Sequence, residues 1–390
     1  MTLPPSLPAL PLTTPLSSLA LSSHVLPNAA PVSVPIGWLL SNAPPSIQYR
    51  ALVELAKFKS SESRFYGLPY ASREGLHLML LQDASDGTWP GGMLTVPSGD
   101  ALTGIGTIVA YRRLIELGWD PESPALACTK RVLFRLLAED DDPRFLCELM
   151  PKAPDDELIR RGRLILREAA AAALAQAGYE NDPRLRGAAR RLTDRVGAYL
   201  KSPLASKPWI RIGNQHVLPA EVHAPSFHTL IMLAHMPHFR SEHHEVMDRM
   251  YGYLSQAWPR QQPVQQVGPH LLEQPHLVLG DFLPTRNVMD ADMPSSLAWL
   301  EVMARLGFLR KHEGWTRLLD RLLDDRDRKG VWRPPRSVVM PEHIPAWSWP
   351  SMPLTGTGSG ADGALAAASV EVTFRLGLIA RLSGRTIEHT

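Results

Sequence analysis

The stretch LLQDASDGTWPGG, residues 80–92, follows an amphipathic run and places Gln82, Gly87 and Trp89 in a turn. Carbonyl groups at the C-terminus of a helix lack partners within the helix, and a glutamine amide can satisfy one of them. Glycine permits a tight turn, and a buried indole adds a large apolar contact area. We therefore predict that this stretch ends one helix and fastens it to the next, and that its role is structural.

The same arrangement recurs near the end of the chain. The stretch LLDDRDRKGVWRP, residues 322–334, places Asp325, Gly330 and Trp332 at the same spacing, with aspartate where the first copy has glutamine. Each copy follows a charged, helix-like segment. A corner that recurs in one chain is typical of a repeated architecture.

Apolar residues recur at helical spacing along most of the chain from Ser46 onward. One segment, 209–218, has the alternation of a short β-hairpin instead. The predicted helices lie within residues 46–58, 72–82, 99–119 (with Asp100 as the cap), 122–139, 154–178, 183–201, 224–236, 241–258, 293–308, 312–325 and 363–384.

These helices fall into pairs. The first helices at residues 45–58, 225–236 and 294–308 each begin with Pro-Ser and continue with apolar residues, whereas the second helices carry more charge. First helices are therefore expected inside and second helices outside. Repeats of this size stack as solenoids or close as rings, and five or six pairs suffice for a ring.

The corner at residues 80–92 resembles the QW motif of the squalene-cyclase and prenyltransferase-type α/α toroids. Arg73 and Gly75, upstream of Gln82, also fit that motif, and residues 37–125 as a whole are similar to bacterial squalene-cyclase-like proteins. The resemblance implies an all-α fold, an α/α toroid of about five or six helical hairpins. It would comprise residues 46–390, preceded by an extended Pro-rich arm at 1–45.

The acids that this family uses are not found in their usual form. The resemblance implies a protonated aspartic acid as the proton donor, within the Asp-x-Asp-Asp signature of cyclases of this kind. The chain has no such string. The acidic runs at 139–143 and 324–327 follow outer helices, where solvated turns are expected. Asp290 and Asp292 precede a predicted helix; they either favour its N-terminus electrostatically or form a degenerate catalytic pair.

A metal site is weakly supported by the sequence. The zinc set of protein prenyltransferases needs Asp, Cys and His in that family's arrangement, and neither Cys128 nor Cys147 has an aspartate two residues before it. His228 and His235 are seven residues apart and share a helix face, so zinc is an alternative to simple packing. We predict no cofactor. Trp332, together with the tryptophans at 347 and 349, is interpreted as packing or a contact edge.

Composition limits the partners. The net charge of +2 and the scattered basic residues argue against nucleic-acid binding. Two cysteines cannot form a disulfide framework, which fits a reducing compartment. The chain lacks an apolar run of about 18 residues, so we predict no membrane-spanning helix. The uncharged, Pro-rich residues 1–45 form either a disordered tail or an arm that docks onto a partner. We expect a cytoplasmic protein, with peripheral membrane contact as an alternative.

Two functions remain open from the sequence. The first is a non-catalytic toroid that acts as an interaction or scaffold subunit, for example on the face of a photosynthetic or respiratory membrane complex, with protein partners bound through the arm and an exposed toroid face. The second is a divergent terpenoid cyclase or prenyltransferase-like enzyme on an isoprenoid or other apolar substrate. The missing acid and metal motifs favour the scaffold function. The resemblance in fold does not decide between the two functions, because fold does not imply function.

Overall fold

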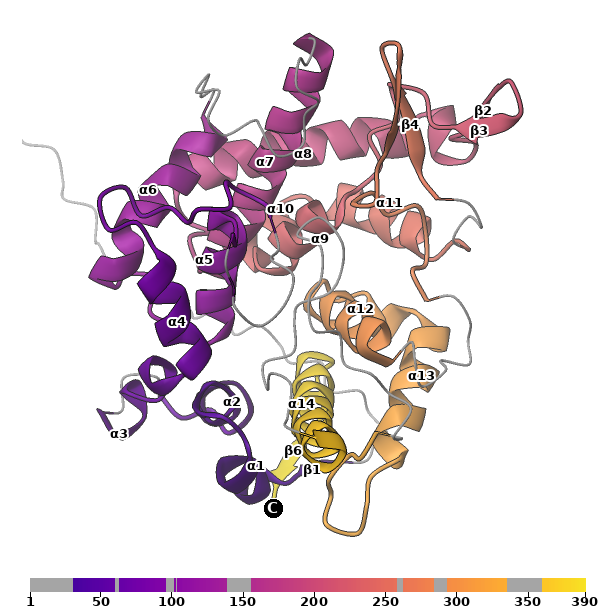
Figure 1. Cartoon of the computed structure of the whole chain (residues 1–390). Coiled ribbons are helices and arrows are strands. Elements are labelled where there is room, and N and C mark those ends of the chain that lie inside the picture. Colours follow the sequence, from indigo (N-terminus) through magenta and orange to yellow (C-terminus); the bar gives the residue numbers. More distant parts are fainter. Residues whose placement is uncertain are drawn as a thin grey trace, which may run out of the picture.

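A computed structural model of the chain describes residues 31–59, 63–95, 102, 104–138, 156–257, 262–283, 293–334 and 360–390 (Figure 1). Within these residues helices dominate, and each strand is three or four residues long. The predicted all-α class is confirmed at this level.

One set of helices has, taken together, more buried apolar residues than the helices that follow them in the chain, and we call this set the inner helices. In α7 an unbroken run of alanines, residues 169–173, is fully buried, because small side chains let neighbouring helices approach closely. The inner helices are α2 (Pro45–Arg50) continued by the π-helix η1 (Ala51–Leu55), α5 (Thr107–Glu116), α7 (Asp156–Gln176), α9 (Phe227–Ala234), α12 (Met293–Arg305) and α14 (Gly360–Leu382).

The second helix of each pair has one buried and one solvent-facing side, and we call these the outer helices. In α13, for example, Leu318, Leu319 and Leu322 are buried while the charged residues between them are not. The outer helices are α4 (Arg73–Leu81), α6 (Pro124–Leu137), α8 (Pro183–Lys201), α11 (His244–Leu254) and α13 (Glu313–Asp324).

Short elements connect these pairs. The hairpin predicted at 209–218 is present, since β2 (Ile210–Ile212) pairs antiparallel with β3 (Gln215–Val217). A second hairpin, β4 (Val264–Val267) with β5 (His270–Glu273), was not predicted. The remaining short elements are α1 (Ile36–Asn42), α3 (Ser63–Tyr66), η2 (Pro69–Ala71), η5 (Pro203–Ala205), α10 (Pro237–Glu242) and η7 (Leu309–Lys311).

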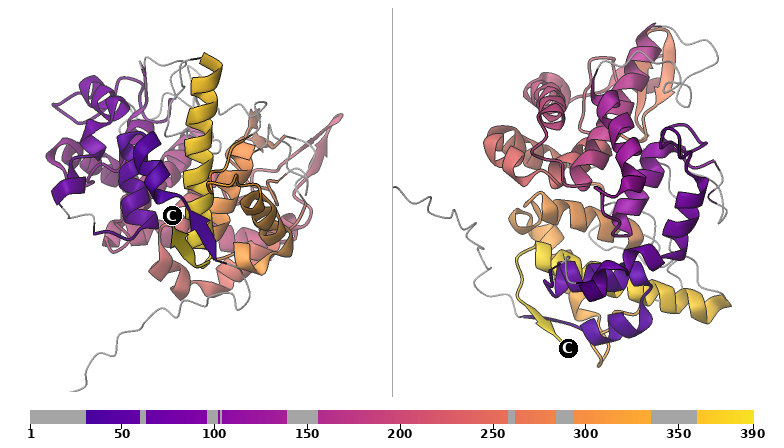
Figure 2. Two further views of the ribbon diagram at one scale, coloured as in Figure 1. Left: turned by 90° about the horizontal axis from the view of Figure 1, so that it is seen from below. Right: turned by 90° about the vertical axis from the view of Figure 1, so that its left-hand side faces the viewer.

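The inner helices pack against one another in chain order. Helix α5 contacts α7, α7 contacts α9, α9 contacts α12, α12 contacts α14, and α14 contacts η1 (Figure 1). Figure 2 shows α14 running between the N-terminal helices on one side and α12 with α13 on the other. The outer helices α6, α8 and α11 likewise contact their neighbours in the same order.

Four inner helices end in the same way. In α5, α7, α12 and α14, the residue after a C-terminal glycine donates its backbone N–H to a carbonyl five residues earlier, and the glycine donates to one three residues earlier. This is the Schellman arrangement, which satisfies the last carbonyls of a helix. The glycines are Gly118, Gly178, Gly307 and Gly384, each with a positive φ.

The two ends of the described chain pair with each other. Strand β1 (Val32–Val34) lies parallel to β6 (Ile387–His389), and both β1 and α1 contact α14 (Figure 2). The segment predicted as an extended arm therefore ends earlier than residue 45. Val32, Val34 and Leu39 are buried, and this apolar surface packs the segment onto the C-terminal helix. Residues 1–30 lie outside the described ranges.

Helix α5 begins later than predicted. It starts at Thr107, with Gly106 at its N-cap, while the predicted cap Asp100 lies outside the described residues. Gly106 donates its backbone N–H to Thr95, and Gly91 donates to Ile105. These bonds to the preceding loop engage backbone N–H and carbonyl groups that an earlier helical turn would need for its own hydrogen bonds.

Among the described helices, α14 is long and apolar enough to cross a bilayer by composition. Its window Gly363–Leu382 has a mean hydropathy of 1.4, and 72% of that window is buried inside the protein. A helix that is buried to this extent against other helices is typical of a protein core.

Candidate functional site

The two tryptophan corners use the same hydrogen bonds. Trp89 donates its indole N–H to the carbonyl of Leu78 in α4 at 2.8 Å, and its backbone N–H to Thr107 at the start of α5 at 3.1 Å. Gly87 adopts a φ of +77° between them. The corner thus joins an outer helix to the next inner helix.

In the second corner Trp332 donates its indole N–H to Leu323 in α13 and its backbone N–H to Thr373 in α14, both at 3.1 Å. Gly330 also has a φ of +77°. The same pair of bonds, made 243 positions apart by Trp89 and Trp332, supports a common structural role for both corners.

The two corners differ at the position of the glutamine. Gln82 donates its amide N–H to Ala125, at 3.1 Å, and to the hydroxyl of Thr129, at 3.0 Å, in α6. Asp325 occupies the matching position after α13, but its side chain is exposed and forms no hydrogen bond with another described residue. Asp327 holds the second turn instead, by accepting the backbone N–H groups of Lys329 and Val331.

The inner helices carry charged pairs at a spacing of four residues. Arg50 with Glu54, Glu301 with Arg305, and Glu371 with Arg375 each form an ion pair within α2–η1, α12 and α14. Pairs four residues apart face the same side of a helix. We call these six residues the inner charge network.

The inner charge network also links helices to one another. Arg305 lies 3.7 Å from Glu54, so α12 is joined to η1, and Arg375 lies 3.2 Å from Glu301, so α14 is joined to α12. Side-chain exposure within the network ranges from 0% for Glu371 to 28% for Glu54. Three arginines therefore balance three glutamates in a mostly buried space.

A related set lies beside this network on α5. Arg113 is buried and donates to both carboxylate oxygens of Glu74, at 2.6 and 2.8 Å, and it lies 3.6 Å from Glu116. Arg112, its neighbour, donates to Gln176 of α7 at 3.2 Å. The polar interior thus extends over α4, α5 and α7.

The electrostatics of the network keep Glu301 ionised. Burial raises the pKa of this carboxyl, but the charges of Arg305, Arg375 and Arg50 outweigh burial and lower the pKa to about 2. Burial lowers the pKa of Arg50, and Glu54 more than reverses that effect. A proton-donating acid needs the opposite shift.

Of the predicted zinc candidates, His228 lies in α9 and His235 is the C-cap of that helix. His228 is 1% exposed, and neither of its ring nitrogens has a hydrogen-bond partner among the described residues. The Nδ1 atom of His235 lies 3.0 Å from the carbonyl oxygen of Ile231. Burial lowers the pKa of both imidazoles, to about 3 in His235. Across the described ranges, no group of three His, Cys, Asp or Glu side chains is placed to hold a metal ion.

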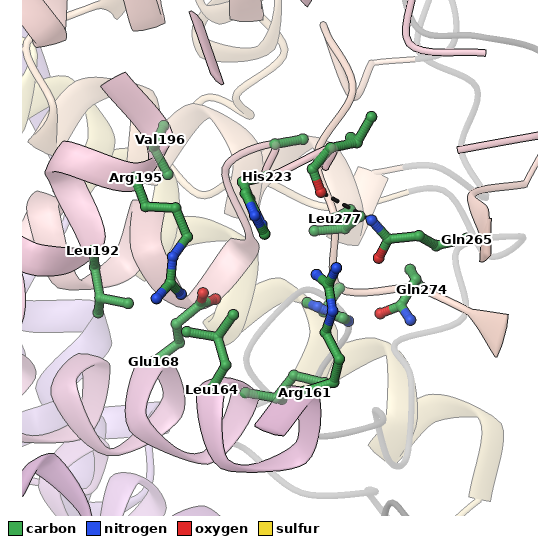
Figure 3. Close-up of a pocket in the computed structure, with 14 residues that line it drawn as sticks. Arg161, Leu164, Glu168, Leu192, Arg195, Val196, His223, Gln265, Gln274 and Leu277 are labelled. Atoms are coloured by element: carbon green, nitrogen blue, oxygen red, sulfur yellow. Dashed lines mark hydrogen bonds between the residues drawn. The ribbon is translucent and has the colours of Figure 1, made fainter. Parts of the chain in front are cut away.

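A small polar cavity lies among α7, α8, the loop before α9, and the residues around β4 and β5 (Figure 3). Its volume is about 30 Å³, which is room for one or two waters. Its polar lining comprises Arg161, Glu168, Arg195, His223, Gln265, Gln274 and His276. The other half of the lining is apolar, but the charged groups in the cavity favour a polar occupant over a hydrocarbon.

Glu168 is the acid of this cavity. Ser226, the N-cap of α9, donates its hydroxyl to the Glu168 carboxylate and accepts the backbone N–H of Thr229 at 3.0 Å. Burial raises the pKa of Glu168 to about 6, although the Ser226 hydrogen bond and the charges of Arg195 and Arg161 oppose that rise. Glu168 can therefore change its charge near neutral pH.

Several predicted residues lie outside the described ranges. These are Asp290 and Asp292, Cys147, the acidic run 139–143 and the tryptophans at 347 and 349. Cys128 is described and is a free, partly buried thiol, and the acidic run 324–327 is described as part of the second corner.

Sequence reasoning missed the inner charge network and the Glu168 cavity. The network had a readable signal, because the sequence places opposite charges four residues apart inside three apolar helices. The cavity had none, since Glu168 and Ser226 are 58 residues apart and meet only when α7 packs on α9.

Comparisons of this chain with protein families, with curated proteins and with solved structures found no match.

Proposed function

We propose that this chain is a non-catalytic α/α toroid, similar to terpenoid cyclases, that acts as an interaction or scaffold subunit. The inner helices would form the inside of the ring and the outer helices its rim. Support comes from the chain-order contacts of the inner helices and from the two tryptophan corners. The pairing of β1 with β6 would bring the ends of the ring together.

The observation that carries the non-catalytic assignment is the inner charge network. A cyclase interior needs an apolar chamber and a carboxylic acid that stays protonated. Here Glu301 and Glu371 are each paired with an arginine, and the pKa of Glu301 is about 2. A fixed, neutralised set of ion pairs suits rigidity and a specific helix register more than proton transfer.

An exposed apolar surface suits the proposed partner contact. Leu76 and Leu80 are four residues apart on α4, hence on one face, and are 50% and 84% exposed. Tyr66 on the neighbouring α3 is also exposed. These two leucines on one helix face are the contact surface that we propose for a partner.

The proposal is tested by isolating the tagged protein from its own cells under gentle detergent and low-salt conditions. We expect a stoichiometric protein companion, and we expect Leu76→Asp/Leu80→Asp to lose that companion while keeping the wild-type helix content. Ile210→Asp on the β2–β3 hairpin is the control and should keep the companion. A peripheral membrane location would follow only if the companion were a membrane complex.

The alternative is a divergent enzyme acting on an isoprenoid or other apolar substrate, with Asp290 or Asp292 as its acid. Among the described residues, Glu168 has the raised pKa that a proton donor needs. Its cavity has a charged lining, however, which does not suit an apolar substrate. Conversion of squalene or of a polyprenyl diphosphate by the isolated monomer, lost in Asp290→Asn or Asp292→Asn, would establish this alternative and overturn the scaffold proposal.

A further inference from the structure

The Glu168 cavity gathers polar groups that have no partner within the described part of the protein. The Nη1 atom of Arg195 is buried and has no hydrogen-bond partner. The side chains of Gln274 and His276 are also buried, at 6% and 7% exposure, and form no side-chain hydrogen bond with a described residue. Leaving a buried polar group unpaired is unfavourable, so an occupant with matching groups would be bound favourably.

The groups that do have partners define the cavity walls. Gln265 donates its amide N–H to the carbonyls of Pro219, at 3.0 Å, and Val222, at 2.9 Å. Arg161 donates to the carbonyl of Ala220 and pairs with Glu157 at 3.3 Å. These bonds fix the loop that carries His223 above the cavity.

Figure 3 shows the Arg195 guanidinium and the Glu168 carboxylate directed toward each other, with Arg161, His223 and Gln274 on the other side of the space. No ion pair within 4.0 Å joins Arg195 to a described residue, so its charge is balanced by Glu168 only at longer range. A planar guanidinium binds a carboxylate through two parallel N–H groups.

We propose that this cavity binds the carboxylate group of a small organic acid, held by Arg195 with Gln274 and His276 as further hydrogen-bond partners, and that protonation of Glu168 strengthens the binding. The site is independent of the proposed scaffold function. Its size fits a formate-sized group, with any remainder of the ligand directed to the open side.

The coupling to protons follows from the charges around Glu168. From α7 it faces Arg161, from α8 Arg195, from α9 the hydroxyls of Ser226 and Thr229, and across the cavity His223 and His276. Burial lowers the pKa of each of these two imidazoles to about 4, so both stay neutral at pH 5.5. When Glu168 is ionised it balances Arg195 and repels an anion. When it is protonated, the charge of Arg195 becomes available to the ligand.

The test is an NMR titration of the full chain with sodium formate, at pH 5.5 and pH 8, with formamide as a neutral probe of similar shape. We expect formate to bind at least ~10-fold more tightly at pH 5.5, because Glu168 is mostly protonated there, and formamide to bind weakly at both. Glu168→Gln should bind formate at pH 8 as tightly as the wild type does at pH 5.5. Arg195→Gln should lose formate binding at both pH values.

A thermal melt of each variant confirms that it is folded before the titration. Equal binding of formate and formamide, formate binding that survives Arg195→Gln in a folded protein, or formate affinity that does not change with pH in the wild type would each overturn the proposal. In those cases the cavity holds water only.

Discussion

At the scale of single residues, the two corner glycines share a backbone conformation but have different surroundings. Both have a φ of +77°, in the left-handed region. A Cβ atom on Gly87 would lie 2.6 Å from the Cβ atom of Cys128 and from the backbone nitrogen of Thr129, whereas on Gly330 the nearest atom is 3.7 Å away in Pro35. An alanine at Gly330 therefore meets backbone strain alone, whereas an alanine at Gly87 meets backbone strain and a steric clash.

We expect Gly330→Ala to reduce the free energy of unfolding by about 1 kcal/mol, the cost of a left-handed alanine. Gly87→Ala should cost about 3 kcal/mol, because overpacking adds to the same strain. Urea denaturation of both variants measures the difference. Equal losses of unfolding free energy in the two variants would show that α6 moves to accommodate the added methyl group and that the close contact at Gly87 is unimportant.

Buried histidines make the stability of the protein depend on pH. Burial lowers the pKa of His276 to about 4, while the unfolded chain binds that proton near pH 6.5. The stability that His276 contributes is therefore complete above pH 6.5 and is lost as the pH falls toward 4. Glu168 acts in the opposite direction, since its folded pKa of about 6 lies above that of the unfolded chain.

We expect His276→Gln to reduce the loss of stability between pH 7.5 and pH 5 by about 2 kcal/mol. His244→Gln, at an exposed position on α11, serves as the control and should change this loss very little. Chemical denaturation at the two pH values gives both results. A His276→Gln protein with the pH dependence of the wild type would contradict the assignment.

At the scale of elements, the two tryptophan corners fasten α4 to α5 and α13 to α14. Because Trp89 and Trp332 make the same two bonds, their replacement should have similar effects. We expect Trp89→Phe and Trp332→Phe each to cost about 1–3 kcal/mol, through the unpaired carbonyl of Leu78 or Leu323 and the lost volume. Guanidinium denaturation tests this; a cost at one corner alone would show that the corners are not equivalent.

The existence of the helices was largely predictable from sequence, because helices depend on local periodicity and on turn residues such as Gly87. The boundary of α5 was not, since the backbone of Gly106 bonds to Thr95 in a loop whose course the sequence does not reveal. The partners of Gln82 were also out of reach, because Ala125 and Thr129 become neighbours only through packing of α6. The same limit hid the Glu168 cavity.

At the scale of the whole molecule, ion pairs join helices that are far apart in sequence. Glu301 binds both Arg305 and Arg375, so its loss leaves, within the described residues, the largely buried Arg305 with Glu54 alone, at 3.7 Å, and Arg375 with Glu371 alone. We expect Glu301→Gln to cost about 3 kcal/mol, whereas Glu245→Gln, in the exposed pair with Arg249, should cost under about 0.5 kcal/mol. Equal costs would mean that water, not the protein, solvates the inner charge network.

The proposed function requires ionised, arginine-paired carboxylates between the inner helices, where a cyclase would hold a protonated acid. The most direct test is ¹³C NMR of glutamate-labelled protein at pH 7, with the side-chain carboxyl signal of Glu301 assigned by Glu301→Gln. We predict that this signal has the shift of an ionised carboxylate at pH 7 and does not move down to pH 5.5. A Glu301 signal of a protonated carboxyl at pH 7 would contradict the account.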